Sequence, residues 1–303
     1  MNMLRTEEKD DALISVIMGV YNQWNQKALY GAVLSILEQT YTNIEFIIYD
    51  DGSDPKVAGY LKELSKMDER IILIGKEENH GLAFSLNACI DKAKGTYIAR
   101  MDADDYSHPY RLEKQYQFME EHHEYGWCGC NTMLFDEDGE WGKRAMPEIP
   151  QPHDYLRFSP FVHPTVMYRA EILRACGGYL DSEETKRCED YEIFMRLQQR
   201  GLKGYNIQKE LFFYRENQES FHRRSFEHRI HEMKVRYNNF KKMNLLFPLG
   251  WIYVIRPLLG GILPVKLVAW LKRNESKEND IRERIDTTIY EGLAAGTADK
   301  GCY

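Results

Sequence analysis

Three short acidic segments carry the side chains of this chain that could do chemistry. They are Asp50-Asp51-Gly52-Ser53, Asp102-Ala103-Asp104-Asp105 and Glu189-Asp190. Carboxylates next to a diphosphate would repel it, because like charges oppose each other at short range, unless a divalent cation lies between them. The middle segment therefore predicts a metal–nucleotide site, provided that Asp102 and Asp104 converge in a turn just after a strand.

Each acidic segment also has a purely structural interpretation. The first could be a tight turn in which Asp and Ser cap a helix and Gly supplies a positive φ. The second could be an N-terminal cap before Pro109, and Glu189-Asp190 could be first-turn charges that favour the positive end of a helix. The elements around the acids bear on this choice.

Strand and helix patterns alternate through the first hundred residues. Apolar, partly β-branched runs at 13–18, 44–49, 71–74 and 97–101 are typical of buried parallel strands. Apolar residues recur at helical spacing within 28–37, 57–67 and 82–92. This alternation predicts an α/β fold with a mostly parallel, Rossmann-like sheet flanked by helices, and ligands bound beyond the carboxyl ends of its strands. Two of the acidic segments fall at such ends.

Composition and motifs narrow the class of protein. With 303 residues, 43% hydrophobic and 29% charged, the chain can bury a sizeable core, which excludes collagen-like, mucin-like and disordered chains. No Gly-x-Gly-x-x-Gly follows the first strand and no Walker lysine loop occurs, so hydride transfer and P-loop phosphoryl transfer lose support. The six cysteines are scattered, which favours reduced, buried thiols over a zinc site.

The motifs, taken in order, give a family resemblance. The chain resembles the inverting glycosyltransferases of family 2, which have the GT-A nucleotide-sugar fold, over roughly residues 14–220. The segments that carry the resemblance are 15–22, 35–40, 50–53, 79–87, 95–105, 109–112, 163–167, 177–179 and 188–192. One of them alone would be weak evidence, but all of them in this order are specific.

The resemblance implies a UDP-sugar donor and assigns roles to five residues. It implies that Asp51 faces the uracil ring, that Gly19 and Tyr21 line the nucleotide pocket, and that Asp102 faces the ribose. Asp104 matches the acid that binds Mg²⁺ or Mn²⁺ in the family.

For the acceptor side, the resemblance implies that Asp190 is the general base. A Glu-Asp pair at the start of a helix keeps the carboxylate ionised, because the helix dipole and exposed amides favour negative charge. In the family reaction an acceptor hydroxyl attacks the anomeric carbon opposite the leaving diphosphate and inverts its configuration. His163, Glu189 and Arg215 are expected to line the acceptor or the phosphates.

The sequence departs from the family after this helix. Many members carry a histidine that reaches the metal or diphosphate, whereas here Asn217 follows Glu216. His222 lies nearby, but an isolated histidine in a polar loop is more often a solvated side chain, so it is not counted among the metal ligands.

The C-terminal part is basic and amphipathic. From Phe221 to Arg273 there are eleven Lys and Arg against two Glu, a balance of +9 in a chain whose net charge is −7. A basic helix is expected past Phe226, followed by apolar stretches at 245–255 and 258–265 that are split by Arg256-Pro257 and are too short to span a bilayer.

Trp251, Tyr253 and Trp270 beside basic residues favour helices lying on an anionic membrane surface. A buried helical hairpin or a homodimer face is the alternative, and nucleic acid is not favoured. Because the N-terminus is polar and is not a signal peptide, the expected place is the cytoplasmic, inner face of the cell membrane.

The predicted organisation has three parts. Residues 1–222 form a GT-A catalytic domain, with a nucleotide-sugar half at about 12–106 and an acceptor half at about 107–222. Residues 223–273 form a helical, amphipathic segment that associates with membrane or forms a dimer, and 274–303 form a polar tail expected to be disordered. Loops at 128–158 and 181–187 are expected to set the donor sugar and acceptor.

The predicted function is a metal-dependent inverting glycosyltransferase in surface polysaccharide or glycan assembly. It would move a sugar from a UDP-sugar to a saccharide acceptor carried on a membrane lipid. A sugar nucleotidyltransferase is the first alternative, although segment 22–27 lacks the Gly-rich loop that such an enzyme should carry. A membrane-associated protein that binds a nucleotide sugar without turnover is the second.

Overall fold

A computed structural model of the chain describes residues 11–216 and 226–260. The first hundred residues alternate between strand and helix, as predicted. The elements are β1 (Ile14–Val20), α1 (Gln26–Leu37), β2 (Ile44–Asp51), α2 (Pro55–Leu64), β3 (Ile71–Lys76), α3 (Leu82–Lys92) and β4 (Tyr97–Arg100). Local caps fix the helix starts: the Asn25 side chain accepts from the Ala28 amide, and Asp54 accepts from the Lys56 amide just before Pro55 begins α2.

The second half of the chain mixes short helices with longer strands. Its elements are β5 (Tyr106–Ser107), α4 (Arg111–Glu121), β6 (Tyr125–Asp136), β7 (Gly139–Arg144), η1 (Pro152–Leu156), η2 (His163–Thr165), β8 (Met167–Arg169), α5 (Ala170–Ala175), η3 (Glu183–Thr185), α6 (Glu189–Gln199), β9 (Lys203–Arg215), α7 (Phe226–Lys242) and α8 (Gly250–Gly260).

Nine strands form one sheet in the order β3-β2-β1-β4-β8-β6-β9-β5, with β7 paired to β6. The first four run parallel to one another, whereas β8 is antiparallel to β4 and β6, and β5 is antiparallel to β9. Ile17 of β1 lies opposite Ile47 on one side and Arg100 on the other. This register brings the carboxyl ends of β1, β2 and β4 to the same edge.

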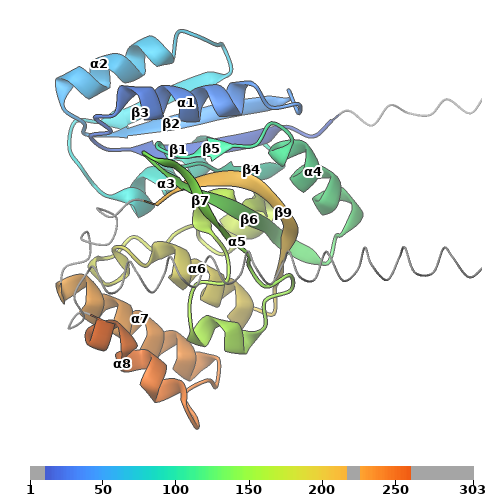
Figure 1. The fold of residues 1–303 in the computed structure, drawn as a ribbon, viewed down its shortest axis with the longest axis vertical. Helices are drawn as coiled ribbons and strands as arrows, with labels where there is room; N and C mark the ends of the chain where they lie inside the picture. The colour runs from blue at the N-terminus through green and yellow to red at the C-terminus, as the bar shows by residue number, and fades with distance from the viewer. Residues whose placement is uncertain (1–10, 217–225, 261–303) are drawn as a thin grey trace, which may run out of the picture.

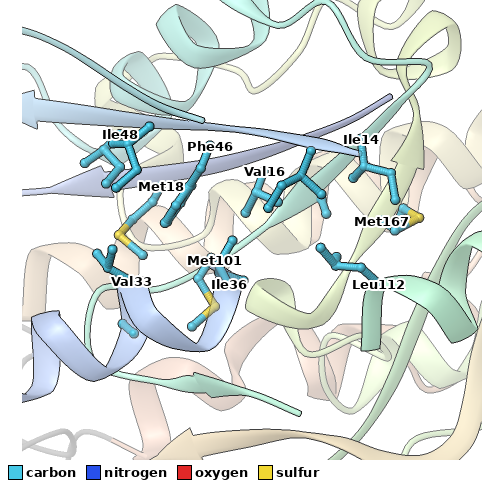
Figure 2. Packing of buried hydrophobic residues seen from close by; sticks show 14 of the residues in the cluster. Ile14, Val16, Met18, Val33, Ile36, Phe46, Ile48, Met101, Leu112 and Met167 are labelled. Carbon is cyan, nitrogen blue, oxygen red and sulfur yellow. The ribbon is translucent and has the colours of Figure 1, made fainter. Parts of the chain in front are cut away.

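The core lies on both faces of the sheet. Alternate residues of β1 point to opposite faces, so Val16 and Met18 pack with α1, α2 and α4, while Ile17 packs with α3, α5 and α6. Figure 2 shows the first group, with Val16, Met18 and Phe46 of the sheet facing Val33 and Ile36 of α1. Helices cover both faces, which is the layered arrangement predicted from the sequence (Figure 1).

The two C-terminal helices lie on the side of the molecule away from α1 and α2 (Figure 1). The predicted basic helix is α7. Arg256-Pro257, which splits the two apolar stretches of the sequence, does not end a helix, because α8 runs through Pro257 and the break before α8 falls in the turn at 243–249. Proline removes a helical donor to the carbonyl four residues earlier, here that of Tyr253, and Arg236 Nη1 lies 3.5 Å from that oxygen.

No helix within the described residues is long and apolar enough to cross a membrane. Most of the second apolar stretch, the tail at 274–303 and Cys302 lie outside the described residues. The five other cysteines are buried and form no disulfide, as expected.

Part of the predicted specificity loop at 128–158 is strand, so that prediction is wrong for residues 128–144. β6 pairs with β7, β8 and β9, and it is buried on both faces over much of its length. Its glycines, cysteines and asparagine give little strand signal by themselves, so tertiary pairing decides the structure there.

Candidate active site

The first acidic segment is a strand end, because β2 continues to Asp51. The Asp51 side chain is 3% exposed. Its Oδ1 accepts from the His80 amide at 2.9 Å, and its Oδ2 accepts from the Gly81 amide at 2.8 Å and from Asn79 Nδ2 at 2.9 Å. Asp51 therefore fixes the loop that leads into α3, and its contact with a uracil ring stays a prediction.

Gly19 and Tyr21 lie at the end of β1, beside this loop. A Cβ at Gly19 would lie 3.1 Å from Ser85 Cβ and 3.2 Å from Leu82 Cδ1, so glycine allows α3 to pack closely against β1. Tyr21 is 55% exposed and can therefore meet a ligand. Its neighbour Asn22 donates its amide to Ser53 Oγ at 3.0 Å, which joins the loops after β1 and β2.

The second acidic segment follows β4 and contains one buried carboxyl group. Asp105 Oδ1 accepts from the Arg215 amide at 2.7 Å, and burial, with help from Asp104 and Asp102, raises the pKa of Asp105 well above its usual value. Arg215 Nε also donates to the Asp104 carbonyl at 3.0 Å. Arg215 thus holds the acidic segment through β9, and its predicted contact with the acceptor or the phosphates stays a prediction.

Arg100 lies among these acids and was not singled out from the sequence. Its guanidinium is 1% exposed, and Nη1 pairs with Asp102 Oδ1. The signal that could have found it is the single charged residue in an otherwise apolar strand, because a buried charge needs a partner. Asp102 and Arg100 form that pair.

The acidic segment suits a hard divalent cation in its chemistry. Among the described residues, no three His, Cys, Asp or Glu side chains gather so that they could hold a metal ion on their own. Mg²⁺ at nucleotide sites commonly takes one or two carboxylates and completes its shell with substrate phosphates and water. The carboxylate of Asp104 fits that donor set, since Asp105 is buried and Asp102 pairs with Arg100, while Asn217 and His222 lie outside the described residues.

The third acidic segment begins α6, as predicted. Asp190 lies in the first turn and is partly exposed, whereas Glu189 is buried. Burial, followed by the charge of Asp190, raises the pKa of Glu189 from 4.5 to about 7. The two adjacent carboxyl groups therefore differ in environment, which is how proteins separate the roles of neighbouring acids.

His163 is buried near the same centre. Its Nε2 and the Tyr179 hydroxyl are 2.8 Å apart, and burial together with the charge of Arg100 lowers the pKa of His163 well below its usual value. The imidazole is therefore neutral at physiological pH, and it can line a ligand as a hydrogen-bonding group but not as a cation.

Arg100 interacts with residues from several segments. Its charge acts on Asp102 and Asp105 after β4, on Glu189 of α6, and on His163 and Tyr179. Asp51, Gly19 and Tyr21 form a neighbouring group at the ends of β1 and β2. The buried Arg100 thus lies close enough to Asp102 to pair with it, and its charge also reaches Glu189, the residue before Asp190.

Comparison with known proteins identifies what the chain is similar to. The family described as Glycosyl transferase family 2 matches residues 15–177. A protein of Bacillus subtilis strain 168 named as the glycosyltransferase EpsE is 38% identical over 257 residues, covering 84% of this chain and 91% of that protein. The O-antigen biosynthesis glycosyltransferase WbnJ of Escherichia coli is 34% identical over 190 residues, covering 61% of this chain and 71% of that protein.

Two solved structures share the fold. Residues 1–349 of TarS from S. aureus, in complex with UDP, superimpose with a TM-score of 0.56 at 20% identity, covering 77% of this chain and 69% of that one. The mannosyltransferase PcManGT from Pyrobaculum calidifontis, in complex with GDP-Man and Mn²⁺, gives 0.58 at 16% identity, covering 96% and 87%.

Proposed function

The chain belongs to glycosyltransferase family 2, and from that premise we propose that it transfers a sugar from a UDP-sugar to a saccharide acceptor with inversion at the anomeric carbon. The observation that carries the proposal is the buried Arg100, which pairs with Asp102 after β4 and whose charge also acts on Glu189 at the start of α6. Family membership also disfavours the alternative of a sugar nucleotidyltransferase.

The donor side is proposed at the ends of β1, β2 and β4. Gly19, Tyr21 and Asp51 would contact the nucleotide base, and Asp102, held by Arg100, would contact the ribose. The complex of TarS with UDP supports a uridine nucleotide, while the GDP-Man complex of PcManGT makes the base a point to test.

A divalent cation is proposed to bind at Asp104. The hard carboxylate oxygens of this segment suit Mg²⁺ or Mn²⁺, and Mn²⁺ is present in the complex of PcManGT. When bound, the cation would neutralise negative charge on the leaving diphosphate. Arg215, which donates to the Asp104 carbonyl at 3.0 Å, keeps this segment in place.

The chemistry proposed for the chain's own residues is proton acceptance at Asp190. The acceptor oxygen forms a bond to the anomeric carbon as the bond from that carbon to the diphosphate oxygen breaks, and the acceptor's proton passes to an Asp190 carboxylate oxygen. The start of α6 favours the ionised carboxylate, because its amides are not used within the helix.

The acceptor is proposed to be a saccharide carried on a membrane lipid, in polysaccharide assembly at the inner face of the cell membrane. Large apolar side chains are exposed on α8 and the turn before it: Phe247, Leu249, Trp251, Ile252 and Ile255. Such side chains beside a basic helix suit the interface of an anionic bilayer. The name of WbnJ, an O-antigen biosynthesis glycosyltransferase, supports a polysaccharide product.

A donor panel tests the proposed function. Purified protein with Mn²⁺ is given UDP-glucose, UDP-galactose, UDP-N-acetylglucosamine or GDP-mannose, and nucleoside diphosphate release is measured with and without a saccharide acceptor. We expect acceptor-dependent release of UDP. Asp104→Asn should abolish both release and Mn²⁺-dependent UDP binding by calorimetry, whereas Asp138→Asn, on the exposed turn between β6 and β7, should change neither.

Two results would contradict the proposed function or its metal site. UDP binding without turnover on any sugar would indicate a catalytically silent binding protein. Unchanged Mn²⁺-dependent UDP affinity in Asp104→Asn would remove Asp104 from the metal site.

A further inference from the structure

Arg236 is a buried cation on α7 that contacts its own helix and three other elements. Its side chain is 6% exposed, and its Nη2 lies 3.0 Å from Glu232 Oε1 on the same helix. Nη1 donates to the Leu156 carbonyl of η1 at 2.9 Å and lies 3.5 Å from the Tyr253 carbonyl of α8. The guanidinium also stacks over the Tyr191 ring of α6 at 4.9 Å from its centroid. The contacts of Arg236 with η1, α8 and Tyr191 therefore go beyond its ion pair with Glu232.

Tyr191 connects this cation to the proposed catalytic base. It follows Asp190 directly in the first turn of α6, and its hydroxyl donates to the carbonyl of Tyr155, the residue before Leu156. Arg236 and Tyr191 therefore hold each other and the same strip of η1 backbone. The first turn of α6 is fixed from outside the helix by this closed set of contacts.

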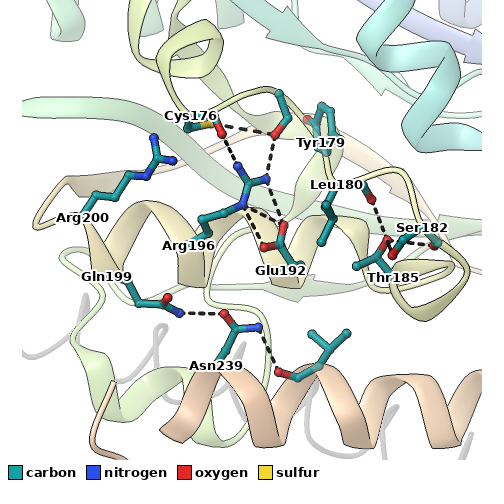
Figure 3. Close-up of polar contacts among 12 residues, drawn as sticks. Cys176, Tyr179, Leu180, Ser182, Thr185, Glu192, Arg196, Gln199, Arg200 and Asn239 are labelled. Carbon is teal, nitrogen blue, oxygen red and sulfur yellow. Dashed lines mark hydrogen bonds and ion pairs between the residues drawn. The ribbon is translucent and has the colours of Figure 1, made fainter. Parts of the chain in front are cut away.

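Other contacts fix the later turns of α6 (Figure 3). Arg196 pairs with Glu192 and donates to the carbonyls of Cys176 and Gly178, and Gln199 donates to Asn239 of α7. Arg196 and Gln199 lie in later turns than Asp190, whereas Glu192 belongs to the first turn. These contacts keep α6 in place as a whole, and Tyr191, the residue next to Asp190, is held separately by Arg236.

We propose that Arg236 is a positioning residue that orients the Asp190 carboxylate through Tyr191. This inference rests on the proposed role of Asp190 as the base. Because a catalytic group must be placed within a fraction of an ångström, loss of the stacked cation should lower the transfer rate while leaving the nucleotide contacts at β1, β2 and β4 unchanged. Because the same guanidinium also lies near the Tyr253 carbonyl, it connects α8 to α6, the helix that carries Asp190.

The test compares substitutions on α7. Arg236→Met removes the cation but leaves Glu232 buried without its partner, which is destabilising, so Glu232→Gln/Arg236→Met removes both charges together. Arg236→Lys keeps a charge but lacks the planar group that stacks on Tyr191. Arg229→Met is the matched control, because Arg229 lies on the same helix and donates to the Pro257 carbonyl of α8 at 3.0 Å.

Three readouts separate positioning from folding. In Arg236→Met and in the double variant, we expect the transfer rate at saturating donor to fall about 10- to 100-fold, and calorimetric UDP affinity in Mn²⁺ to stay within about twofold. Amide hydrogen exchange in segment 188–194 should become faster than in the wild type, and Arg236→Lys should restore little of either change. Arg229→Met should keep wild-type transfer and wild-type exchange in that segment.

Wild-type transfer and wild-type exchange in the folded double variant would overturn the proposal, since they would make Arg236 a partner of Glu232 and nothing more. Asp190→Asn is assayed alongside. If that variant transfers normally, the base assignment fails, whereas exchange in 188–194 still decides whether Arg236 orders the first turn.

Discussion

At the scale of single residues, Glu189 and Asp190 are adjacent carboxylic acids in the first turn of α6 whose exposure to solvent differs. Asp190 is partly exposed, while Glu189 is buried. We expect Asp190→Asn to keep Mn²⁺-dependent UDP affinity and to lower transfer by about 100-fold or more, since Asn preserves the shape and removes the basicity. Donor affinity, melting temperature and transfer rate should be measured on the same preparation.

If Asp190 were only a charge at a helix start, the same change would cost at most about 1 kcal/mol of stability and leave transfer almost intact. That outcome would move the role of base to Glu189 or another group.

The buried Glu189 makes a prediction about pH. Its pKa rises from 4.5 to about 7 on folding, chiefly through burial, so the folded protein binds more protons than the unfolded chain between these values. The free energy of unfolding should therefore fall as pH rises from about 4.5 to 7, by up to about 3 kcal/mol from this group. Urea unfolding across this range should show the slope.

Glu189→Gln should flatten this dependence, because it removes the ionising group and keeps the shape. Glu171→Gln, at an exposed position of α5, should leave the slope as in the wild type. An equal slope in both variants would show that the pH dependence arises elsewhere.

Residue chemistry was partly readable from the sequence. The acids could be found because they follow apolar strands or open a helix. The neutral state of His163 could not be predicted, because it depends on burial and on Arg100, which is far from His163 in the sequence but acts on it in the folded chain. Arg236 lies in a basic helix where most cations are solvated, so its burial is visible only in three dimensions.

At the scale of elements, Asn87 links α3 to the turn after α5. Its Nδ2 donates to the Tyr179 carbonyl and its Oδ1 accepts from the Tyr179 amide, both at 2.8 Å. We expect Asn87→Leu to lower the free energy of unfolding by about 1–3 kcal/mol, because both backbone groups lose their partner. Asn43→Leu, at an exposed position, should change it by less than about 0.5 kcal/mol. Equal urea midpoints for the two variants would contradict this role of Asn87.

Element positions were predictable where pattern and propensity agree. α3 was placed at its observed ends, and the first four strands at nearly theirs, because their apolar runs are bounded by polar turns. The strands at 125–144 were missed because pairing with β8 and β9, rather than local sequence, makes them strands. α8 continues through Pro257 because tertiary contacts reach the carbonyls around that residue.

At the scale of the whole molecule, the exposed apolar side chains of α8 make a prediction about membranes. We expect full-length protein to co-sediment with anionic vesicles, and Ile252→Glu/Ile255→Glu to lose that binding while keeping transfer to a soluble acceptor. Ile149→Glu, at another exposed apolar residue, is the matched control and should bind as the wild type. Raising salt should weaken the binding only in part, because apolar insertion is not screened.

A protein that does not bind vesicles and instead loses its dimer in the double variant would favour a homodimer face.

At this scale the sequence predicted the layered α/β architecture through alternation of strand and helix. The partner of α8 could not be predicted, because an apolar helix face looks the same whether lipid or protein covers it.

The single sheet also bears on how substrates enter and leave. Strands before and after residue 107 belong to one hydrogen-bonded ladder, with β4 joined to β8 and β8 to β6. A hinge that opened the protein between its donor and acceptor sides would have to break that ladder, so large rigid-body closure is disfavoured. Under the proposed function, admission of the donor and release of the nucleotide would then fall to the connecting segments, such as 79–81 and 181–187.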